Sequence, residues 1–301
     1  MKIVSMGGGL GNQMFKYAFA LALKKVHPDE EIMIDSRMCR YRNDHNGYEL
    51  EHLFDLKLKE ASWREVRSVS KRASLSILYK LNPQWYDRSV KRFYDCKDEN
   101  YVEDYQAAGV YNDGLLYSTK SLYYDVAAQA WQYYDGMEEE LNDTFRLKKK
   151  NCDDAFLEKE YELGKECSIG IHIRGGDYLS KVNKIYNVCT IEYYKEALRI
   201  LKQRCPEGRL YVFTNDVPYL DSIRESVFGN ERITVMGHQG KDSYKDIFLM
   251  KKCQALIIAN SSFSWWGAWL NNRKDKIVIA PKQWMSGKGF PDVCPNFWLR
   301  L

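Results

Sequence analysis

The second half of the chain alternates short apolar runs with segments of helical periodicity, and this alternation limits the available folds more than any other feature. We expect strands at residues 168–174, 210–213, 233–236, 255–259 and 277–280. Helices are expected near residues 192–203, 219–227, 244–253 and 263–270. Strands that alternate with helices pair in parallel through right-handed crossovers. The sequence therefore predicts an α/β layer of the nucleotide-binding type.

Three of the expected strands end in polar residues. The clusters are His172/Arg174/Asp177, Thr214/Asn215/Asp216 and Asn260/Ser261/Ser262. Because ligands of open parallel sheets bind beyond the carboxyl ends of the strands, we expect these clusters to line one binding edge. A guanidinium matches two phosphate oxygens, helix-start hydroxyls are donors for a phosphate, and Asp216 offers acceptors to a base or ribose. A structural pair of Arg174 and Asp177 over the Gly175–Gly176 turn is the alternative.

The first half begins with a strand, a glycine loop and a helix. Residues 2–6 (KIVSM) form the expected strand, residues 7–13 read GGGLGNQ, and apolar residues recur at helical spacing over 14–25. Such a loop points backbone amides, at the positive end of a helix, towards a ligand, although ordinary turn chemistry explains it equally well. Four more elements are expected: a strand at 32–35, helices over 61–81 and 121–145, and a linker with a polar helix over 148–165.

Basic and aromatic residues crowd the middle of the first half. The basic residues are Arg64, Arg67, Lys71, Arg72, Lys80, Arg88, Lys91 and Arg92. A solvated face is the ordinary interpretation, and a surface for anionic lipid or a lipid-diphosphate carrier is the alternative. The aromatic residues are Trp85, Tyr86, Phe93, Tyr94, Tyr101, Tyr105, Tyr111 and Tyr117. Such rings pack a core or stack on sugars.

Composition places the chain among ordinary globular proteins. Its 301 residues are 45% hydrophobic and 29% charged, enough for two medium domains. A net charge of +4 spread over this length argues against nucleic acid. We find no signal peptide or membrane span and expect a cytoplasmic protein, with peripheral contact at the inner face of the membrane as an alternative. The eight cysteines lack metal-ligand spacing, so we expect reduced thiols and no metal site.

Five blocks of this sequence, in this order, resemble the family 11 glycosyltransferases, the α-1,2-fucosyltransferases. They are GGGLGNQMFKYAFALAL (7–23), HIRGGDYL (172–179), VFTND (212–216), DIFLMKKCQALIIANSSFSWWGAWLN (246–271) and KIVIAPKQW (276–284). The resemblance implies a GT-B type fold, in which two Rossmann-like domains face a cleft. We expect an acceptor-side domain at 1–150, with a helical and aromatic insertion, and a GDP-fucose-binding domain at 151–301.

The resemblance also implies the site residues. GDP-fucose would be held by Gly9, Asn12, Gln13, His172, Arg174, Asp216, Asn260, Ser261, Ser262 and Phe263. Asn12 and Gln13 would reach the diphosphate from the first domain. Trp265 and Trp266 are expected to pack the helix instead of touching ligand.

The chemistry implied is transfer of L-fucose from GDP-β-L-fucose to the 2-hydroxyl of a galactose-type residue, with inversion. The acceptor would be a galactose-terminated oligosaccharide or a lipid-linked glycan. No Asp-x-Asp is present to hold a metal, so we expect Arg174 and the helix-start donors to stabilise the leaving diphosphate without a cofactor. Asp177 is the first choice for the base, with Asp216 and Asp246 as alternatives.

The sequence also departs from the family pattern. Lys16 stands where Gln is frequent, and residues 214–216 replace a commoner Ser-Asp-Asp. Leu116 and Tyr117 replace an aromatic residue and a Gln, so we expect residues 61–124 to shape the acceptor side. Another acceptor hydroxyl is therefore an alternative.

Two other classes of protein are alternatives to a glycosyltransferase. A Rossmann dehydrogenase needs GxGxxG after its first strand, which GGGLGNQ does not provide. A non-catalytic glycan-binding protein explains the aromatic residues but not the three polar strand ends.

Overall fold

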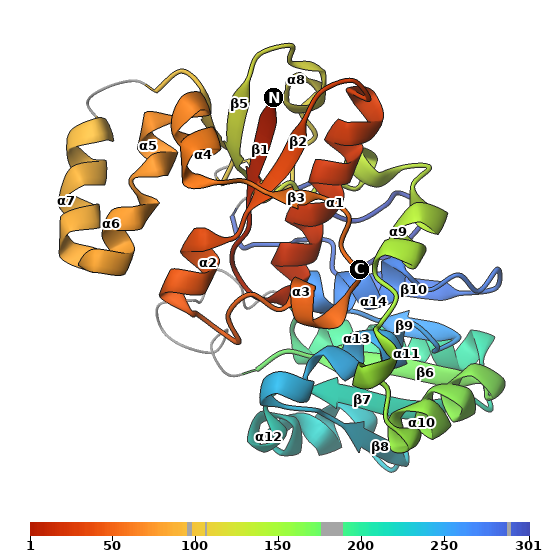
Figure 1. Ribbon diagram of the computed structural model, residues 1–301. Coiled ribbons are helices and arrows are strands. Elements are labelled where there is room, and N and C mark those ends of the chain that lie inside the picture. Colours follow the sequence, from red (N-terminus) through yellow and green to blue (C-terminus); the bar gives the residue numbers. More distant parts are fainter. Residues whose placement is uncertain (95–97, 106, 176–188, 288–289) are drawn as a thin grey trace. The chain divides into compact units, whose positions relative to one another are not determined.

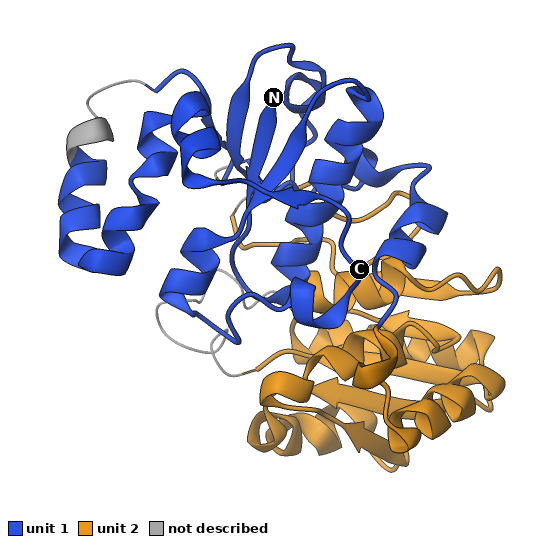
Figure 2. Cartoon of the chain, viewed as in Figure 1, with its two compact units in different colours: residues 1–147 blue, residues 148–301 orange. Residues whose placement is uncertain are grey.

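The computed structural model describes residues 1–94, 98–105, 107–175, 189–287 and 290–301. The chain divides into two compact units, Met1–Leu147 and Lys148–Leu301, which Figure 2 colours separately. We refer to them as unit 1 and unit 2. The boundary lies at 147/148, beside the expected 150/151.

Unit 1 is built on a parallel sheet of five strands in the order β3-β2-β1-β5-β4. The strands are β1 (Lys2–Ser5), β2 (Ile32–Asp35), β3 (Lys59–Glu60), β4 (Tyr101–Glu103) and β5 (Leu122–Asp125). The expected strands at 2–6 and 32–35 are confirmed as β1 and β2, which pair directly with each other. The other three were not predicted.

The helices of unit 1 differ most from expectation. They are α1 (Leu10–Val26), α2 (Arg37–Arg42), α3 (Leu50–Leu53), α4 (Trp63–Val69), α5 (Lys71–Ser74), α6 (Ser76–Leu81), α7 (Pro83–Tyr94), α8 (Asp113–Tyr117) and α9 (Glu138–Thr144), with a 3₁₀ turn η1 (Trp131–Tyr134). The prediction of a single helix over 61–81 is wrong. Ser70 is extended, and its hydroxyl accepts a hydrogen bond from the amide of Ala73, so it ends α4 and caps α5.

The prediction of a single helix over 121–145 is also wrong. Its first residues form β5, which pairs with β1 on one side and β4 on the other. Leu122, Tyr123 and Tyr124 are all buried there, and a short apolar run of this kind suits a central strand as well as a helix. Only η1 and α9 in the rest of the segment are helical.

Unit 2 contains a parallel sheet of six strands in the order β11-β10-β9-β6-β7-β8. Its strands are β6 (Ser168–Ile173), β7 (Arg209–Thr214), β8 (Ile233–Met236), β9 (Ala255–Ile257), β10 (Ile277–Ala280) and β11 (Leu299–Arg300). Its helices are α10 (Asp154–Lys165), α11 (Ile191–Arg204), α12 (Val217–Phe228), α13 (Tyr244–Met250) and α14 (Ser262–Trp269), with 3₁₀ turns η2 (Lys149–Asn151) and η5 (Gly240–Asp242). All five expected strands and the five helices are confirmed, and β11 was not predicted.

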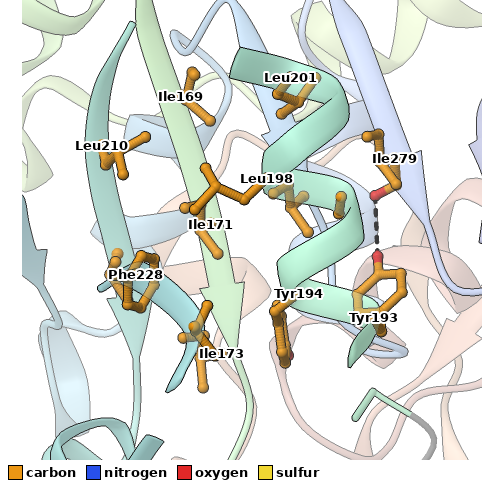
Figure 3. Close-up of a cluster of buried hydrophobic side chains, with 14 of the residues drawn as sticks. Ile169, Ile171, Ile173, Tyr193, Tyr194, Leu198, Leu201, Leu210, Phe228 and Ile279 are labelled. Carbon is orange, nitrogen blue, oxygen red and sulfur yellow. Dashed lines mark hydrogen bonds between the residues drawn. The ribbon is translucent and has the colours of Figure 1, made fainter. Parts of the chain in front are cut away.

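The core of unit 2 lies between its sheet and the helices that cover it (Figure 3). Ile169, Ile171 and Ile173 project from one face of β6 and are at most 1% exposed. The hydroxyl of Tyr193, on α11, donates to the carbonyl oxygens of Ile258 at 2.7 Å and Ile279 at 3.3 Å. These contacts fix α11 against the middle of the sheet.

The described cysteines are all free thiols, and five of the seven are buried, which fits the expected packing role. In the parts of the chain that the structure describes, no helix is long and apolar enough to cross a membrane.

Candidate active site

The polar strand ends of unit 2 lie side by side. Strands β9, β6 and β7 are direct neighbours in the sheet, and their register places Ile257 beside Ile171 and Thr214 beside Ile173. The residues that follow these strands therefore leave the sheet at one carboxyl edge. This confirms the predicted common edge for the described members of the three clusters, while Asp177 lies outside the described residues.

His172 occupies the end of β6, where its side chain is buried. Its ring lies 5.9 Å from that of Phe263, with 31° between the planes, and the residue is 3% exposed. Burial, assisted by the charge of Arg174, lowers the pKa of His172 to about 3. The Nδ1 atom has no hydrogen-bond partner among the described residues. A neutral imidazole is therefore held at the edge with one nitrogen unused.

The start of α14 lies at the same edge. Ser261 is the N-cap, and its Oγ accepts a hydrogen bond from the amide of Phe263 at 3.3 Å. Ser262 and Phe263 are half-buried, whereas Trp265 and Trp266 are completely buried, as expected for packing residues. The first turn of the helix is thus accessible while its body anchors it in the core, which suits a helix start that binds an anion.

Asn260 uses its side chain inside unit 2. Its Nδ2 donates to the carbonyl oxygen of Trp284 at 2.9 Å, and its Oδ1 accepts from the thiol of Cys189 at 3.5 Å. These bonds connect the β9–α14 turn to two other segments. They give Asn260 a structural function, and its predicted contact with a nucleotide stays a prediction.

Asp216 caps α12 at the end of β7. Its Oδ1 accepts from the amide of Tyr219 at 3.0 Å, and its own amide donates to Thr214 Oγ1 at 3.0 Å. A Cβ atom at Gly175 would lie 2.7 Å from Asp216 Oδ2, so this close approach requires glycine. The segment that carries Arg174 is thereby held against the end of β7, and Arg174 itself is half-buried. Asp177, the first choice for the base, lies outside the described residues.

A His–Asp pair that sequence analysis missed lies at the same edge. His238 Nδ1 is 2.6 Å from Asp246 Oδ1, and the amide of His238 donates to Asp246 Oδ2 at 3.2 Å. Burial raises the pKa of Asp246, and the hydrogen bond to Asp246 raises the pKa of His238. The alternative base Asp246 is therefore engaged by His238. No local signal in the sequence joins these two residues, which lie on either side of the β8–α13 connection.

The glycine loop of unit 1 follows the carboxyl end of β1. Gly8 has φ +76°, a left-handed conformation that favours glycine, and Gly9 is the N-cap of α1. Gln13 is completely buried: its Nε2 donates to the carbonyl oxygens of Gly8 and Gly47, both at 2.8 Å, and its Oε1 accepts from the amide of Glu49 at 3.0 Å. The Gln13 amide thus holds the loop, while donor contacts of Gly9 and Gln13 stay predictions.

Asn12 presents a half-buried side chain from the first turn of α1. Its Oδ1 accepts a hydrogen bond from Gln129 Nε2 at 3.0 Å, which orients the amide. Of the three residues predicted from this loop, Asn12 is the one whose side chain is both oriented and accessible.

A buried ionic network lies one turn further along α1. Lys16 Nζ is 2.9 Å from Tyr105 Oη and 3.3 Å from Asp125 Oδ1. The hydroxyls of Tyr101 and Tyr105 both donate to Asp125, at 2.7 and 2.6 Å. Burial would raise the pKa of Asp125, but Lys16 and the two hydroxyls outweigh it and lower the pKa. The Lys that departs from the family pattern thus has a matched counter-ion.

Two further departures, Leu116 and Tyr117, lie at the opposite edge of the same sheet. They belong to α8, which precedes the amino end of β5, and the carbonyl oxygen of Leu116 accepts from His27 Nε2 at 2.6 Å. His27 follows the last residue of α1, about 22 Å from Asn12 along the helix axis. This position does not favour the predicted acceptor role of Leu116 and Tyr117.

Within the described residues, no three His, Cys, Asp or Glu side chains gather as metal ligands would. Whether catalysis needs a metal stays a prediction.

Two Escherichia coli proteins resemble this chain over nearly its whole length. The α-1,2-colitosyltransferase is 31% identical over 99% of this chain and 98% of its own. The O-antigen biosynthesis glycosyltransferase WbnK is 27% identical over 98% of this chain and 99% of its own. Mouse galactoside 2-α-L-fucosyltransferase Sec1 is 26% identical over 50% of this chain and 42% of its own.

Solved structures support the fold. The α-1,6-fucosyltransferase NodZ, soaked with GDP-fucose, aligns with a TM-score of 0.52 at 15% identity, over 89% of this chain and 91% of its own. Arabidopsis thaliana FUT1 in complex with GDP aligns with a TM-score of 0.50 at 10% identity, over 93% and 70%. The predicted GT-B class, with two parallel sheets each packed with helices, is therefore confirmed. The family model described as "Glycosyl transferase family 11" matches residues 2–290. This chain therefore belongs to glycosyl transferase family 11, as the five sequence blocks indicate.

Proposed function

We propose that this glycosyltransferase moves L-fucose from GDP-β-L-fucose to the 2-hydroxyl of a galactose-type residue, with inversion to an α-linked product. The acceptor we propose is a galactose-terminated oligosaccharide or lipid-linked glycan. Two relatives support the linkage, since one is named an α-1,2-colitosyltransferase and another a galactoside 2-α-L-fucosyltransferase. In this proposal unit 2 holds the donor and unit 1 contributes to the acceptor side.

One observation carries the donor part of the proposal: a neutral, buried His172 with an unused nitrogen stands beside the accessible start of α14. A neutral imidazole can donate or accept one hydrogen bond, which suits a phosphate oxygen or a ribose hydroxyl. The helix start adds amide donors at its positive end. Together these groups match a nucleoside diphosphate better than a neutral glycan.

In this proposal the charge that develops during the reaction lies at the same edge. When the bond between sugar C1 and the diphosphate breaks, negative charge grows on the leaving phosphate and positive charge on the sugar ring. Arg174 follows β6 directly and carries a planar guanidinium that matches two phosphate oxygens. We propose that Arg174 stabilises the leaving diphosphate, that Asn12 assists from unit 1, and that a carboxylate, Asp177 in the first place, takes the acceptor proton.

A second donor is favoured by a specific observation, the 31% identity to a colitosyltransferase. Colitose is the 3-deoxy counterpart of fucose, so the two sugars differ by one hydroxyl, and we propose that GDP carries both. A site that hydrogen-bonds the 3-hydroxyl rejects the deoxy sugar strongly, whereas a site without such a partner accepts both.

The proposal is tested with purified protein, an array of galactose-terminated acceptors, and GDP-fucose and GDP-colitose in parallel. We expect transfer from GDP-fucose, and a product whose NMR spectrum shows an α-linkage to galactose O2. A product linked through another hydroxyl would contradict the acceptor part. Exclusive use of GDP-colitose would contradict the fucosyl donor while keeping the nucleotide.

Donor binding is tested separately from turnover by thermal shift with GDP, UDP, ADP and NAD. GDP at 100 times its dissociation constant should raise the unfolding free energy by about 2.7 kcal/mol. His172→Phe preserves the ring contact with Phe263 and removes the ring nitrogens, so it should fold normally and lose GDP stabilisation. Stronger stabilisation by UDP or NAD would overturn the proposed donor.

Metal independence is part of the same proposal and has its own test. Transfer should continue at its full rate in excess EDTA, because we propose that Arg174 and the α14 start carry the charge of the diphosphate. Loss of transfer on chelation, with recovery on adding Mg²⁺ or Mn²⁺, would refute this part alone.

A further inference from the structure

Helices α6 and α7 form a hairpin that projects from unit 1, away from the strands of its sheet (Figure 1). The turn between them is short, and Asn82 Oδ1 accepts a hydrogen bond from the amide of Gln84 at 2.9 Å. The inner side of the hairpin is closed by an edge-to-face contact of Tyr79 with Tyr86, whose centroids are 5.5 Å apart. The hairpin is thus a defined structural element.

The outer side of the hairpin exposes large apolar side chains. Leu81 is 68% exposed, Trp85 is 55% exposed and Ile77 is 40% exposed. Ile77 and Leu81 are four residues apart on α6, so they share one helix face, and Trp85 lies in the first turn of α7, just beyond the connection. Three neighbouring residues of this size on one projecting element form an apolar surface that water solvates poorly.

Basic side chains accompany this apolar surface. Lys80, Arg88 and Lys91 are exposed, and Asp87 is the one acid between residues 77 and 91. Arg88 and Lys91 form no ion pair with another described residue. We call the set Ile77, Lys80, Leu81, Trp85, Arg88 and Lys91 the hairpin face.

We propose that the hairpin face docks this enzyme on an anionic lipid surface. Apolar side chains that include a Trp, flanked by Lys and Arg, are the pattern of elements that lie in the membrane interface. The indole is stable at the level of the headgroups, the aliphatic chains enter the acyl boundary, and the cations meet anionic headgroups. The inference does not depend on which sugar is transferred.

Charge complementarity favours lipid over the other occupants of such a surface. A second copy of the chain would bring the same three cations against themselves, because a twofold interface pairs a surface with its own copy. A soluble polyanion would match the cations but leave Leu81 and Ile77 in water. An anionic bilayer matches both parts of the hairpin face at once.

The proposal is tested by co-sedimentation of the full chain with vesicles of phosphatidylcholine alone or mixed equally with phosphatidylglycerol. We expect binding to the mixed vesicles that weakens with added salt, and little binding to phosphatidylcholine. Arg88→Gln with Lys91→Gln should weaken this binding by about 30-fold, since each basic residue near the surface contributes about a factor of five. Leu81→Ser with Trp85→Ser should weaken it by at least about tenfold.

A matched variant controls for net charge. Lys195→Gln with Lys274→Gln removes two exposed lysines of unit 2 and should leave vesicle binding unchanged. A second readout uses brominated lipid, which should quench wild-type tryptophan fluorescence and quench Trp85→Phe clearly less. Equal binding to both vesicle types, equal loss in the matched variant, or unchanged quenching in Trp85→Phe would overturn the proposal. So would a dimer in solution that Leu81→Ser with Trp85→Ser dissociates, because a second copy would then cover the face.

Discussion

The carboxyl edges of the two sheets differ most in how the polar groups at the end of one central strand are paired. In unit 1 the opposite charges are paired, with Lys16 beside Asp125 and Arg37 2.8 Å from Asp35, and of these groups the Nη1 atom of Arg37 has no hydrogen-bond partner among the described residues. In unit 2 His238 is paired with Asp246 at the same edge, but His172 retains an unused nitrogen next to the accessible start of α14. A satisfied ionic network stabilises a rigid edge, whereas a buried polar atom without a partner costs free energy until a ligand supplies one.

We propose that this difference divides the roles of the two sheets in the enzyme. Unit 2 has kept hydrogen-bonding capacity at its edge, at the expense of stability, and we propose that the nucleotide diphosphate uses it. Unit 1 uses its charges to fix α1, from which Asn12 projects. Variants of the unit 2 edge should therefore impair binding and turnover, and variants of the unit 1 network should mainly impair stability.

The largest effect is expected at Arg174. Removing one partner of a buried charge pair costs about 2–5 kcal/mol, so Arg174→Ala should lower kcat/KM by roughly 30-fold to several thousand-fold. Arg174→Lys keeps the charge but loses the planar fork, and should recover part of the loss. Steady-state kinetics with GDP-fucose measure both. A folded Arg174→Ala within a few-fold of wild type would show that the unit 2 edge does not carry the leaving charge.

The next largest effect is expected at Lys16, on stability. Breaking a buried ion pair costs about 3–5 kcal/mol, and because the side chain of Asp125 is 25% exposed we expect the low end for Lys16→Met. Urea unfolding followed by circular dichroism measures it. Lys195→Met, at an exposed site, is the control and should change stability by less than about 0.5 kcal/mol. An equal effect of the two substitutions would remove the claim that the unit 1 edge is held by its charges.

The same variant should show a characteristic pH dependence. The pKa of Asp125 is lowered in the folded chain, so the ion pair contributes stability above the unfolded pKa of about 4, and this contribution is lost as pH falls through the folded pKa. The stability difference between wild type and Lys16→Met should therefore be complete at pH 7 and shrink below about pH 4. A difference that stays constant from pH 7 to pH 3 would point to lost packing instead of lost charge.

A smaller effect is expected at Asn12. The side chain is oriented by Gln129 but is not part of the ionic network, so Asn12→Ala should leave stability nearly unchanged. Loss of one hydrogen bond to the reacting complex lowers turnover by about tenfold, while the affinity of unit 2 for GDP should stay within about twofold. Gln129→Leu, which removes the orienting donor, should lower turnover less. Equal losses of GDP affinity and turnover in Asn12→Ala would contradict the division of roles between the units.

The strands and helices of unit 2 were predicted from the sequence more accurately than those of unit 1, and the reason is physical. The strands of unit 2 are continuous apolar runs between clear helices, and their order along the chain already implies a shared edge. In unit 1, β3 and β4 have two and three residues, too few for a period to appear. β5 follows a turn that has no glycine or proline, so the sequence shows no break there and predicts a helix through it.

Side-chain partners were the least predictable feature of both units. Lys16 and Asp125 are 109 residues apart, and they meet because α1 follows β1, which pairs with β5. The His238–Asp246 pair depends likewise on the path between β8 and α13. Residue types at strand ends indicated where a site lies, but which of its polar groups are already hydrogen-bonded required the structure.

The smallest effect is expected at Tyr117, and it gives the sharpest test of the comparison between edges. Tyr117 is 61% exposed on α8, at the amino edge of the unit 1 sheet, at the far end of α1 from Asn12. Restoring the family's frequent residue with Tyr117→Gln should therefore leave the KM for acceptor and for donor within about twofold of wild type, since exposed substitutions away from a site change little. Competition between two galactose-terminated acceptors in one reaction would reveal even a small change in preference. A several-fold change would place acceptor recognition at the amino edge of the unit 1 sheet, in agreement with the acceptor role that the sequence predicts for Leu116 and Tyr117.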